Sequence, residues 1–272
     1  MSSTTQKMKL HQALAQLCPI IGSNVAVQRI PYALTNACYQ LDNGKHRYSL
    51  RLNNPQALDL GISRMRETVI LTHVSTEPWA VEVVDISEHW LLTKWIQGSA
   101  FKPNTLKDIE QLAELVRHVH SCQIQPNVAA PPLNVCRQVE HLLTHCPIEN
   151  QTMLTFIKDR CRRYKIPAQL TLCFHDWHPG NLIQKSENLV LIDWEYAALG
   201  DPVVDIACLM SGFQLNEPLR RYLQDLLQVS DDHLESALCL TELMSILWYQ
   251  VRFPDHSRMN DLLAWQQSWQ NR

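Results

Sequence analysis

The stretch that decides the fold runs from residue 172 to residue 205 and reads LCFHDWHPGNLIQKSENLVLIDWEYAALGDPVVD. In it an aspartate, Asp176, is followed five residues later by an amide, Asn181. Two short apolar runs around the polar residues 185–188 predict a β-hairpin, and a second aspartate, Asp193, follows the second run. Asp176 and Asn181 are therefore expected just before the hairpin and Asp193 just after it.

These three residues have the chemistry needed to handle a nucleotide phosphate. Mg²⁺ prefers a few oxygen ligands and keeps its remaining waters, so the amide oxygen of Asn181 and the carboxylate of Asp193 are the predicted metal ligands. During phosphoryl transfer the proton of the attacking hydroxyl leaves late, and an aspartate of ordinary pKa is a sufficient base if it is well positioned. Asp176 is predicted to be that base.

The stretch resembles two segments of the aminoglycoside and choline/thiamine kinases, which share a protein-kinase-like fold. Their catalytic segment usually reads H-G-D-L-H-x-x-N, and here residues 174–181 read FHDWHPGN. Their metal segment reads I-D-W-E-Y-A-x-x-G-D-P-x-x-D and is matched almost completely by residues 192–205. The resemblance implies an ATP-dependent phosphotransferase with Mg²⁺ as cofactor and a small-molecule alcohol as acceptor. Within the family, the chain looks most similar to the bacterial thiamine kinases.

The catalytic segment departs from the family pattern at one position. The usual histidine two residues before the base is Phe174 here, and His175 stands between Phe174 and Asp176. Phe174 is expected to hold the loop by packing, and His175 to take over part of the bracing without being catalytic. His178, in the turn between the base and Asn181, is expected to be a structural hydrogen-bonding residue.

The first third of the chain predicts a small antiparallel sheet that carries one helix. Residues 47–52 alternate polar and apolar side chains after an Asp-Asn-Gly turn, so Arg51 points away from the core. Apolar residues at 62, 65 and 69 have helical spacing, and strand-like runs follow at 79–84 and 90–95. The resemblance implies that Arg51 contacts the phosphates of ATP and that Glu67, in the helix, pairs with Arg51.

The resemblance also implies the other contacts with ATP. The nucleotide loop is expected at residues 33–37, although the chain has no glycine from residue 23 to residue 43. Residues 91–95 resemble the hinge that offers backbone groups to adenine. The residues expected to contact ATP are Thr35 and Asn36 in the loop, and Lys94 and Trp95 in the hinge.

From residue 105 onward helices dominate, beginning with a long amphipathic stripe from residue 106 to residue 119. Asp201 is the predicted cap of an apolar helix at 203–210, and Asp205 is predicted to brace the catalytic loop. The predicted fold class is therefore α+β, bilobal and protein-kinase-like. Residues 1–95 would form the nucleotide-binding lobe, and residues 96–272 a mainly helical lobe with the catalytic loops and the acceptor pocket.

The acceptor alcohol is expected to bind between Asp176 and the carboxyl-terminal helices. Aromatic faces beside a carboxylate suit a quaternary or aromatic cation, and the predicted substrate-binding residues are Glu195, Trp248 and Tyr249. Roughly half of the aromatic residues in this region are expected to be core only. An aminoglycoside would need a dense acidic pocket, so thiamine or choline ranks above an aminoglycoside or amino sugar. A kinase-like module that binds without catalysis is a further alternative.

Composition excludes several other classes of protein. The 272 residues carry a net charge of −3 with scattered lysines and arginines, so nucleic acid is not an expected partner. No apolar run approaches the roughly 20 residues needed to cross a bilayer, so no membrane partner and a cytoplasmic location are expected. The nine cysteines are dispersed, which predicts reduced thiols and no zinc site. The oligomeric state and the choice between ATP and GTP stay open.

Overall fold

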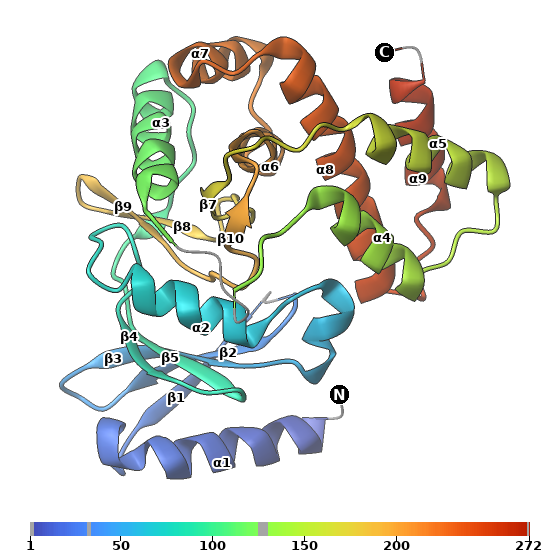
Figure 1. Cartoon of the computed structure of the whole chain (residues 1–272). Helices are drawn as coiled ribbons and strands as arrows, with labels where there is room; N and C mark the ends of the chain where they lie inside the picture. Colours follow the sequence, from blue (N-terminus) through green and yellow to red (C-terminus); the bar gives the residue numbers. More distant parts are fainter. Residues whose placement is uncertain (1–2, 32–33, 125–129, 271) are drawn as a thin grey trace.

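The computed structural model describes residues 3–31, 34–124, 130–270 and 272, and Figure 1 shows its two lobes. The N-terminal lobe contains α1 (Ser3–Ile21), β1 (Ala26–Ile30), β2 (Ala37–Asp42), β3 (Arg47–Leu52), the 3-10 helix η1 (Pro55–Leu60), α2 (Arg64–His73), β4 (Val83–Ile86) and β5 (Trp90–Lys94). Its strands form an antiparallel sheet in the order β1-β2-β3-β5-β4. The predicted lobe boundary, between residues 95 and 96, falls just after β5.

The C-terminal lobe is mainly helical. Its helices are α3 (Leu106–Ser121), α4 (Val135–His145), α5 (Gln151–Arg163), α6 (Pro202–Gly212), α7 (Glu217–Leu227), α8 (Asp231–Arg252) and α9 (Met259–Trp269). The strands are β6 (Ser99–Ala100), β7 (Thr171–Cys173), β8 (Leu182–Lys185), β9 (Asn188–Leu191) and β10 (Ala198–Gly200). They pair as two small antiparallel sheets, β6-β8-β9 and β10-β7. This is the predicted α+β bilobal arrangement, and the predicted hairpin is β8–β9.

Alternation of side chains along β2 and β3 builds the core of the N-terminal lobe. Leu41 and Leu50 are fully buried on one face of the sheet, and Arg51 lies on the other face as predicted. The apolar face packs against α1 through Ala13 and Leu17, which are four residues apart. Helix α1, on the side of the sheet away from the other lobe (Figure 1), was not among the predicted elements. Its core-facing residues recur at helical spacing, but exposed apolar residues on its other faces, such as Met8 and Ile20, weaken the contrast between the faces.

Helix α2 lies on the opposite side of the sheet, facing the C-terminal lobe (Figure 1). It begins at Arg64 because the Ser63 side chain accepts a hydrogen bond from the backbone N–H of Arg66. The predicted helix is confirmed, but Met65, one of the apolar residues that indicated it, is 64% exposed, whereas Glu67 is 1% exposed. The buried face of the helix carries Glu67 together with the apolar Ile70 and Leu71. Apolar burial and the ion pair of Glu67 described below therefore turn the same face inward.

One apolar core crosses from the N-terminal lobe into the C-terminal lobe. Trp79, which precedes β4, stacks on Trp194 with the ring centroids 5.7 Å apart. The backbone N–H of Leu191 donates to the carbonyl of Trp79 at 2.8 Å. Ile70 of α2 belongs to the same buried cluster. The two lobes are therefore joined by shared packing on the side where the chain passes between them.

Helix α6 confirms the prediction made for residues 203–210. Asp201 is its N-cap, and the side chain accepts a hydrogen bond from the backbone N–H of Val203 at 2.8 Å. No helix in the ranges given above is long and apolar enough to span a membrane.

The packing of α1 gives the first prediction. Leu17 is 1% exposed in the core of the N-terminal lobe, so Leu17→Ala should lower the free energy of unfolding by about 2–5 kcal/mol. Met8, on the same helix, is 60% exposed, and Met8→Ala should change the free energy of unfolding by less than about 0.5 kcal/mol. Urea unfolding measures both values. Equal effects of the two substitutions would show that α1 does not pack in this way.

Candidate active site

The loop that follows β7 carries the predicted base. The side chain of Asp176 is 32% exposed, and the Asn181 amide Nδ2 donates to its carboxylate at 2.7 Å and to its backbone carbonyl at 3.0 Å. Burial and the negative charge of Asp193 raise the pKa of Asp176 to about 7, above the ordinary value assumed from the sequence. Because Nδ2 is used by Asp176, Oδ1 is the atom of Asn181 that remains for a metal ion.

Asp193 lies two residues after β9, in a left-handed backbone conformation with φ 61°. This conformation is uncommon for a residue other than glycine, and such strain is concentrated at functional sites. The carboxylate accepts a hydrogen bond from Arg51 Nη1 at 2.6 Å, and 31% of the side chain is exposed. The fold thus brings Asp193 of one lobe to Arg51 of the other.

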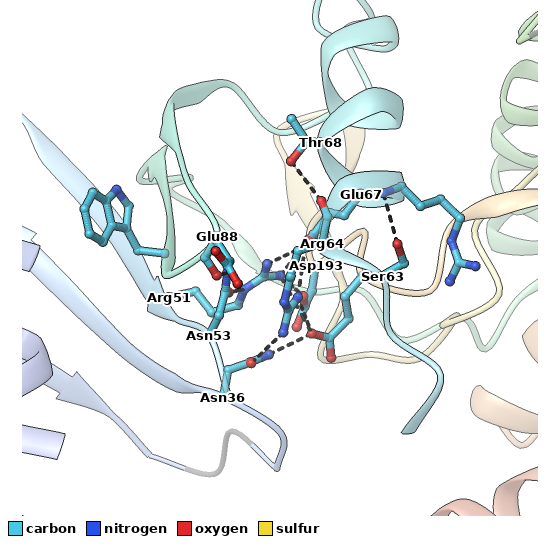
Figure 2. A network of polar contacts seen from close by, with 12 residues as sticks. Asn36, Arg51, Asn53, Ser63, Arg64, Glu67, Thr68, Glu88 and Asp193 are labelled. Atoms are coloured by element: carbon cyan, nitrogen blue, oxygen red, sulfur yellow. Dashed lines mark hydrogen bonds and ion pairs between the residues drawn. The ribbon is translucent and has the colours of Figure 1, made fainter. Parts of the chain in front are cut away.

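Arg51 and Glu67 form the predicted pair, shown in Figure 2. The Arg51 Nη1 and Nη2 atoms donate to the two Glu67 carboxylate oxygens at 2.7 and 2.6 Å, and both side chains are buried. Burial alone would lower the pKa of Arg51, but the charges of Glu67 and Asp193 raise it, so the guanidinium stays charged. Burial would likewise raise the pKa of Glu67, and Arg51 outweighs it and holds that pKa below its ordinary value. The pair is a rigid, bidentate contact between β3 and α2.

Helix α6 supports the catalytic loop from behind. Asp205 is fully buried, and its Oδ1 accepts hydrogen bonds from the His175 backbone N–H at 2.6 Å and from Trp177 Nε1 at 2.7 Å. Its Oδ2 lies 2.8 Å from His120 Nε2. At the end of α6, a Cβ on Gly212 would lie 1.7 Å from the Trp177 carbonyl oxygen, so only glycine fits there. The predicted bracing role of Asp205 is confirmed.

The residues just before the base behave as the sequence departure suggests. Phe174 is fully buried, with its ring packed edge-on against Trp177 and Trp194. His175 is left-handed, with φ 63°, and its Nδ1 lies 3.3 Å from the Tyr196 carbonyl oxygen. Burial lowers the pKa of His175, so a neutral ring that donates through Nδ1 fits this contact. Packing by Phe174 and bracing by His175 together hold the loop.

The base and Asp193 open onto a cleft of about 990 Å³ between the lobes. The cleft contains nearly all predicted site residues. Those that line it are Thr35, Asn36, Arg51, Lys94, Trp95, Asp176, Asn181, Asp193, Glu195, Trp248 and Tyr249. Glu67 stands behind Arg51, and residue 33 of the predicted nucleotide loop lies outside the described residues. Trp265 and Trp269 are buried in the core of the C-terminal lobe, as expected for part of the aromatic set.

The hinge residues use their backbone amides within the sheet. The N–H of Lys94 donates to the Glu82 carbonyl, and that of Trp95 to the Arg47 carbonyl, each at 2.9 Å. The Lys94 ammonium also pairs with the Glu82 carboxylate on the surface. For the predicted contact with adenine, the carbonyl groups of the hinge and Ile96, which also lines the cleft, are the groups to consider.

Two residues at the site were missed from the sequence, Arg64 and Tyr196. Arg64 Nη1 donates to Glu67 at 2.9 Å and to Glu195 at 3.0 Å. The Tyr196 hydroxyl accepts a hydrogen bond from Trp248 Nε1 at 2.5 Å. Arg64 stands three residues before Glu67, a spacing that places two side chains on the same helix face and could have indicated it. Glu195 lines the cleft but is 2% exposed and already paired, so its role toward an acceptor stays a prediction.

The oxygen donors of the site fit Mg²⁺. Asn181 supplies a neutral amide oxygen and Asp193 a carboxylate, the ligand types that this hard cation prefers. In the structure, the positive charge beside Asp193 is the Arg51 guanidinium. The other cluster of potential ligands among the described residues is His120, Cys173 and Asp205. There both Asp205 oxygens have partners, and burial raises the pKa of the Cys173 thiol, so that cluster reads as structural.

Most of the sequence matches one known family. The model of the family described as "Phosphotransferase enzyme family" matches residues 26–238. The chain belongs to this family. The match covers the Arg51 strand, the catalytic loop and the Asp193 segment, so the protein is an ATP-dependent small-molecule phosphotransferase, a small-molecule kinase. No curated protein matches the sequence.

Three solved structures show the same fold. Choline kinase LicA from Streptococcus pneumoniae has a TM-score of 0.79 at 15% identity, over 96% of this chain and 98% of that one. An ethanolamine kinase from Plasmodium vivax has a TM-score of 0.75 at 15% identity, over 98% and 88%. The ADP-bound aminoglycoside phosphotransferase APH(2'')-Ib has a TM-score of 0.64 at 15% identity, over 94% and 95%. The predicted protein-kinase-like fold is confirmed.

The bracing of the loop by Asp205 gives a second prediction. Asp205→Ala leaves the His175 N–H and the Trp177 indole without their buried acceptor, and should lower the free energy of unfolding by about 2–5 kcal/mol. Asp159→Ala breaks only the pairs with Arg162 and Arg163 on the surface of α5, and should cost less than about 1 kcal/mol. Thermal unfolding compares the two. A loss no greater for Asp205→Ala than for Asp159→Ala would contradict the bracing role.

Proposed function

We propose that this kinase transfers the γ-phosphoryl group of ATP to the hydroxyl of a small cationic alcohol, thiamine or choline. The observation that carries the proposal is the composition of the cleft. The pair formed by Asp176 and Asn181 opens onto the same space as the aromatic rings of Trp248, Tyr249 and Tyr196. A reacting hydroxyl at Asp176 would therefore have an aromatic wall beside the rest of its molecule.

In the proposed mechanism, Asp176 orients the acceptor hydroxyl and takes its proton. The hydroxyl oxygen forms a bond to the γ-phosphorus while the bond from that phosphorus to the β,γ-bridging oxygen breaks, and ADP leaves with the bridging oxygen. Asn181 Nδ2 holds the Asp176 carboxylate in place through the 2.7 Å hydrogen bond. Arg51, kept charged and fixed by Glu67, binds phosphate oxygens. Mg²⁺ on Asn181 and Asp193, when bound, would supply positive charge for the phosphates.

The acceptor wall comes largely from one face of α8. Residues 241, 244, 245, 248 and 249 all line the cleft, and their spacing puts them on a single helix face. The Trp248 and Tyr249 rings meet edge-on, with their centroids 5.1 Å apart. A ring face attracts a positively charged ligand by about 0.5–2 kcal/mol, and the Arg258 guanidinium already lies over the Tyr249 ring, 5.0 Å from its centroid. This wall favours one delocalised or quaternary cation.

The second candidate function is an aminoglycoside or amino-sugar kinase. A structural neighbour is an aminoglycoside phosphotransferase, but such acceptors carry several amines and call for several free carboxylates. The carboxylates that line the cleft are Asp176, Asp193 and Glu195, and Asp193 and Glu195 are already paired with arginines. A module that binds without catalysis is less well supported, because Asp176, Asn181, Asp193 and Arg51 are all present.

The test of the proposal is Mg²⁺-dependent ADP release with thiamine, choline, ethanolamine, a hexosamine and kanamycin as acceptors. Turnover on thiamine or choline is expected. Asp176→Ala should lower kcat by at least a hundredfold and leave the Kd of ATP within about threefold, because the base acts on the acceptor. Turnover on kanamycin alone would contradict the proposed acceptor. Loss of ATP binding in Asp176→Ala would contradict the proposed base.

The aromatic wall gives a separate prediction. Trp248→Leu removes a ring face and should raise the KM of the cationic acceptor by roughly tenfold, while the Kd of ATP stays within about twofold. Trp248→Phe keeps a ring face and serves as the matched control, with a smaller rise. An equal rise in the acceptor KM for Trp248→Leu and Trp248→Phe would mean that the ring contributes shape and not attraction for the cation.

A further inference from the structure

The loop between β1 and β2 contains no glycine, and its described residues line the cleft. Glycine-rich phosphate loops depend on the absence of side chains to bring the backbone close to a nucleotide. Here the described end of the loop is held by side chains. Two residues of that end have contacts that reach distant parts of the chain, Leu34 and Asn36. Their contacts carry the inference below.

Asn36 joins three segments of the chain, and Figure 2 shows it beside Arg64. Its Oδ1 accepts hydrogen bonds from Arg64 Nη2 at 2.9 Å and from the Asn54 backbone N–H at 3.1 Å. Its Nδ2 donates to Glu195 Oε2 at 2.8 Å. Both the oxygen and the nitrogen of the amide thus help to fix one residue at the end of the loop.

Arg64 and Glu195 complete a group that we call the Asn36 latch. Arg64 Nη1 donates to Glu195 Oε2 at 3.0 Å, the same oxygen that accepts from Asn36. Glu195 is 2% exposed, and a buried carboxylate is costly unless charge and hydrogen bonds compensate it. A second tie holds the loop from the other lobe, where Arg252 Nε of α8 donates to the Leu34 carbonyl at 2.7 Å.

The Asn36 latch is directly connected to Arg51, the residue proposed to bind the phosphates of ATP. Arg64 Nη1 also donates to Glu67 Oε2, and Glu67 holds Arg51. Arg51 Nη1 lies 3.9 Å from Glu195 Oε2. The position of the loop end and the position of the Arg51 guanidinium are therefore set by one set of contacts, in which each buried carboxylate has more than one positive or donor neighbour.

We propose that Arg64 and Glu195 are positioning residues for ATP, which hold the glycine-free loop in place over the phosphates through Asn36. Three consequences follow. The phosphate site exists before the nucleotide binds. The Glu195 carboxylate serves the latch and does not bind the cation of the acceptor. The aromatic rings of the cleft are then left to attract that cation. The proposal rests on the ATP site of the kinase and not on which alcohol it phosphorylates.

The experiment is a set of calorimetric titrations with ATP and adenosine, in the presence of Mg²⁺ and again with a chelator. Asn36→Ala should raise the Kd of ATP roughly tenfold, the effect of losing hydrogen bonds to charged groups, and leave the Kd of adenosine within about twofold. Asn36→Asp keeps the acceptor for Arg64 but turns a carboxylate toward Glu195. It should therefore raise the Kd of ATP at least as much as Asn36→Ala does. Both variants change a half-buried loop residue, so the fold should be retained.

Arg64→Met tests the cation, with Arg221→Met as its control. Arg221 pairs with Glu217 on α7 with its side chain 75% exposed, so its removal should leave both Kd values unchanged. Arg64→Met should raise the Kd of ATP and leave the Kd of adenosine unchanged. The proposal would be overturned if Arg64→Met raised the Kd values of adenosine and ATP by equal factors. It would also be overturned if Asn36→Ala left the Kd of ATP unchanged. Weakening that vanishes when Mg²⁺ is removed would overturn it too, because it would make these residues part of the metal site.

Glu195→Gln separates the latch from an acceptor role. Its amide oxygen can still accept from Arg64 and Asn36, so the Kd of ATP should rise only about two- to fivefold, and the KM of the acceptor should be unchanged. A tenfold rise in the acceptor KM with unchanged ATP binding would overturn the assignment of Glu195. If no alcohol of the panel is phosphorylated, the proposed acceptor fails while the ATP titrations still decide the latch.

Discussion

The buried guanidinium of Arg51 constrains the rest of the structure. A charge that is almost completely removed from water requires several partners, and Arg51 takes them from α2 and from the segment after β9. Glu67 must therefore face inward, which fixes the rotation of α2 against the sheet. Asp193 must reach across the cleft, which fixes the distance between the lobes. The same contacts that satisfy one buried charge also align Arg51, the proposed phosphate contact, with Asp193, the proposed metal ligand.

The second constraint is the backbone shape of the catalytic loop. His175, next to the predicted base, and Asp193, the predicted metal ligand after β9, adopt left-handed conformations without being glycine. Such conformations persist only when the surroundings enforce them. For His175 the surroundings are Asp205, which holds its backbone N–H, and the Tyr196 carbonyl beside its ring. The buried wall of Phe174, Trp177 and Trp194 completes the support, so the family's usual histidine at position 174 is replaced by packing.

Sequence patterns predicted the parts of the molecule that depend on short-range spacing. The Asp176–Asn181 turn, the β8–β9 hairpin and the Asp201 cap all lie within a few residues of the signal that indicates them. Helix α1 was missed because exposed apolar residues, such as Met8 and Ile20, weaken the contrast between its faces. Residues 62, 65 and 69 indicated α2 but not its buried face, which carries Glu67, because the partner of Glu67 lies 16 positions away in sequence. The contact of Asn36 with Glu195 joins residues 159 positions apart, and no local pattern indicates it.

The contacts between the lobes differ in kind from one side of the cleft to the other. On one side Trp79 and Trp194 stack within a continuous apolar core. Around the cleft the lobes meet through ion pairs and hydrogen bonds of Arg51, Asn36 and Arg252. Separating the apolar core would expose its surface to water, whereas the contacts around the cleft are polar. Any rotation of one lobe against the other would therefore pivot near the Trp79–Trp194 stack, and the contacts of Arg51, Asn36 and Arg252 would limit how far it goes.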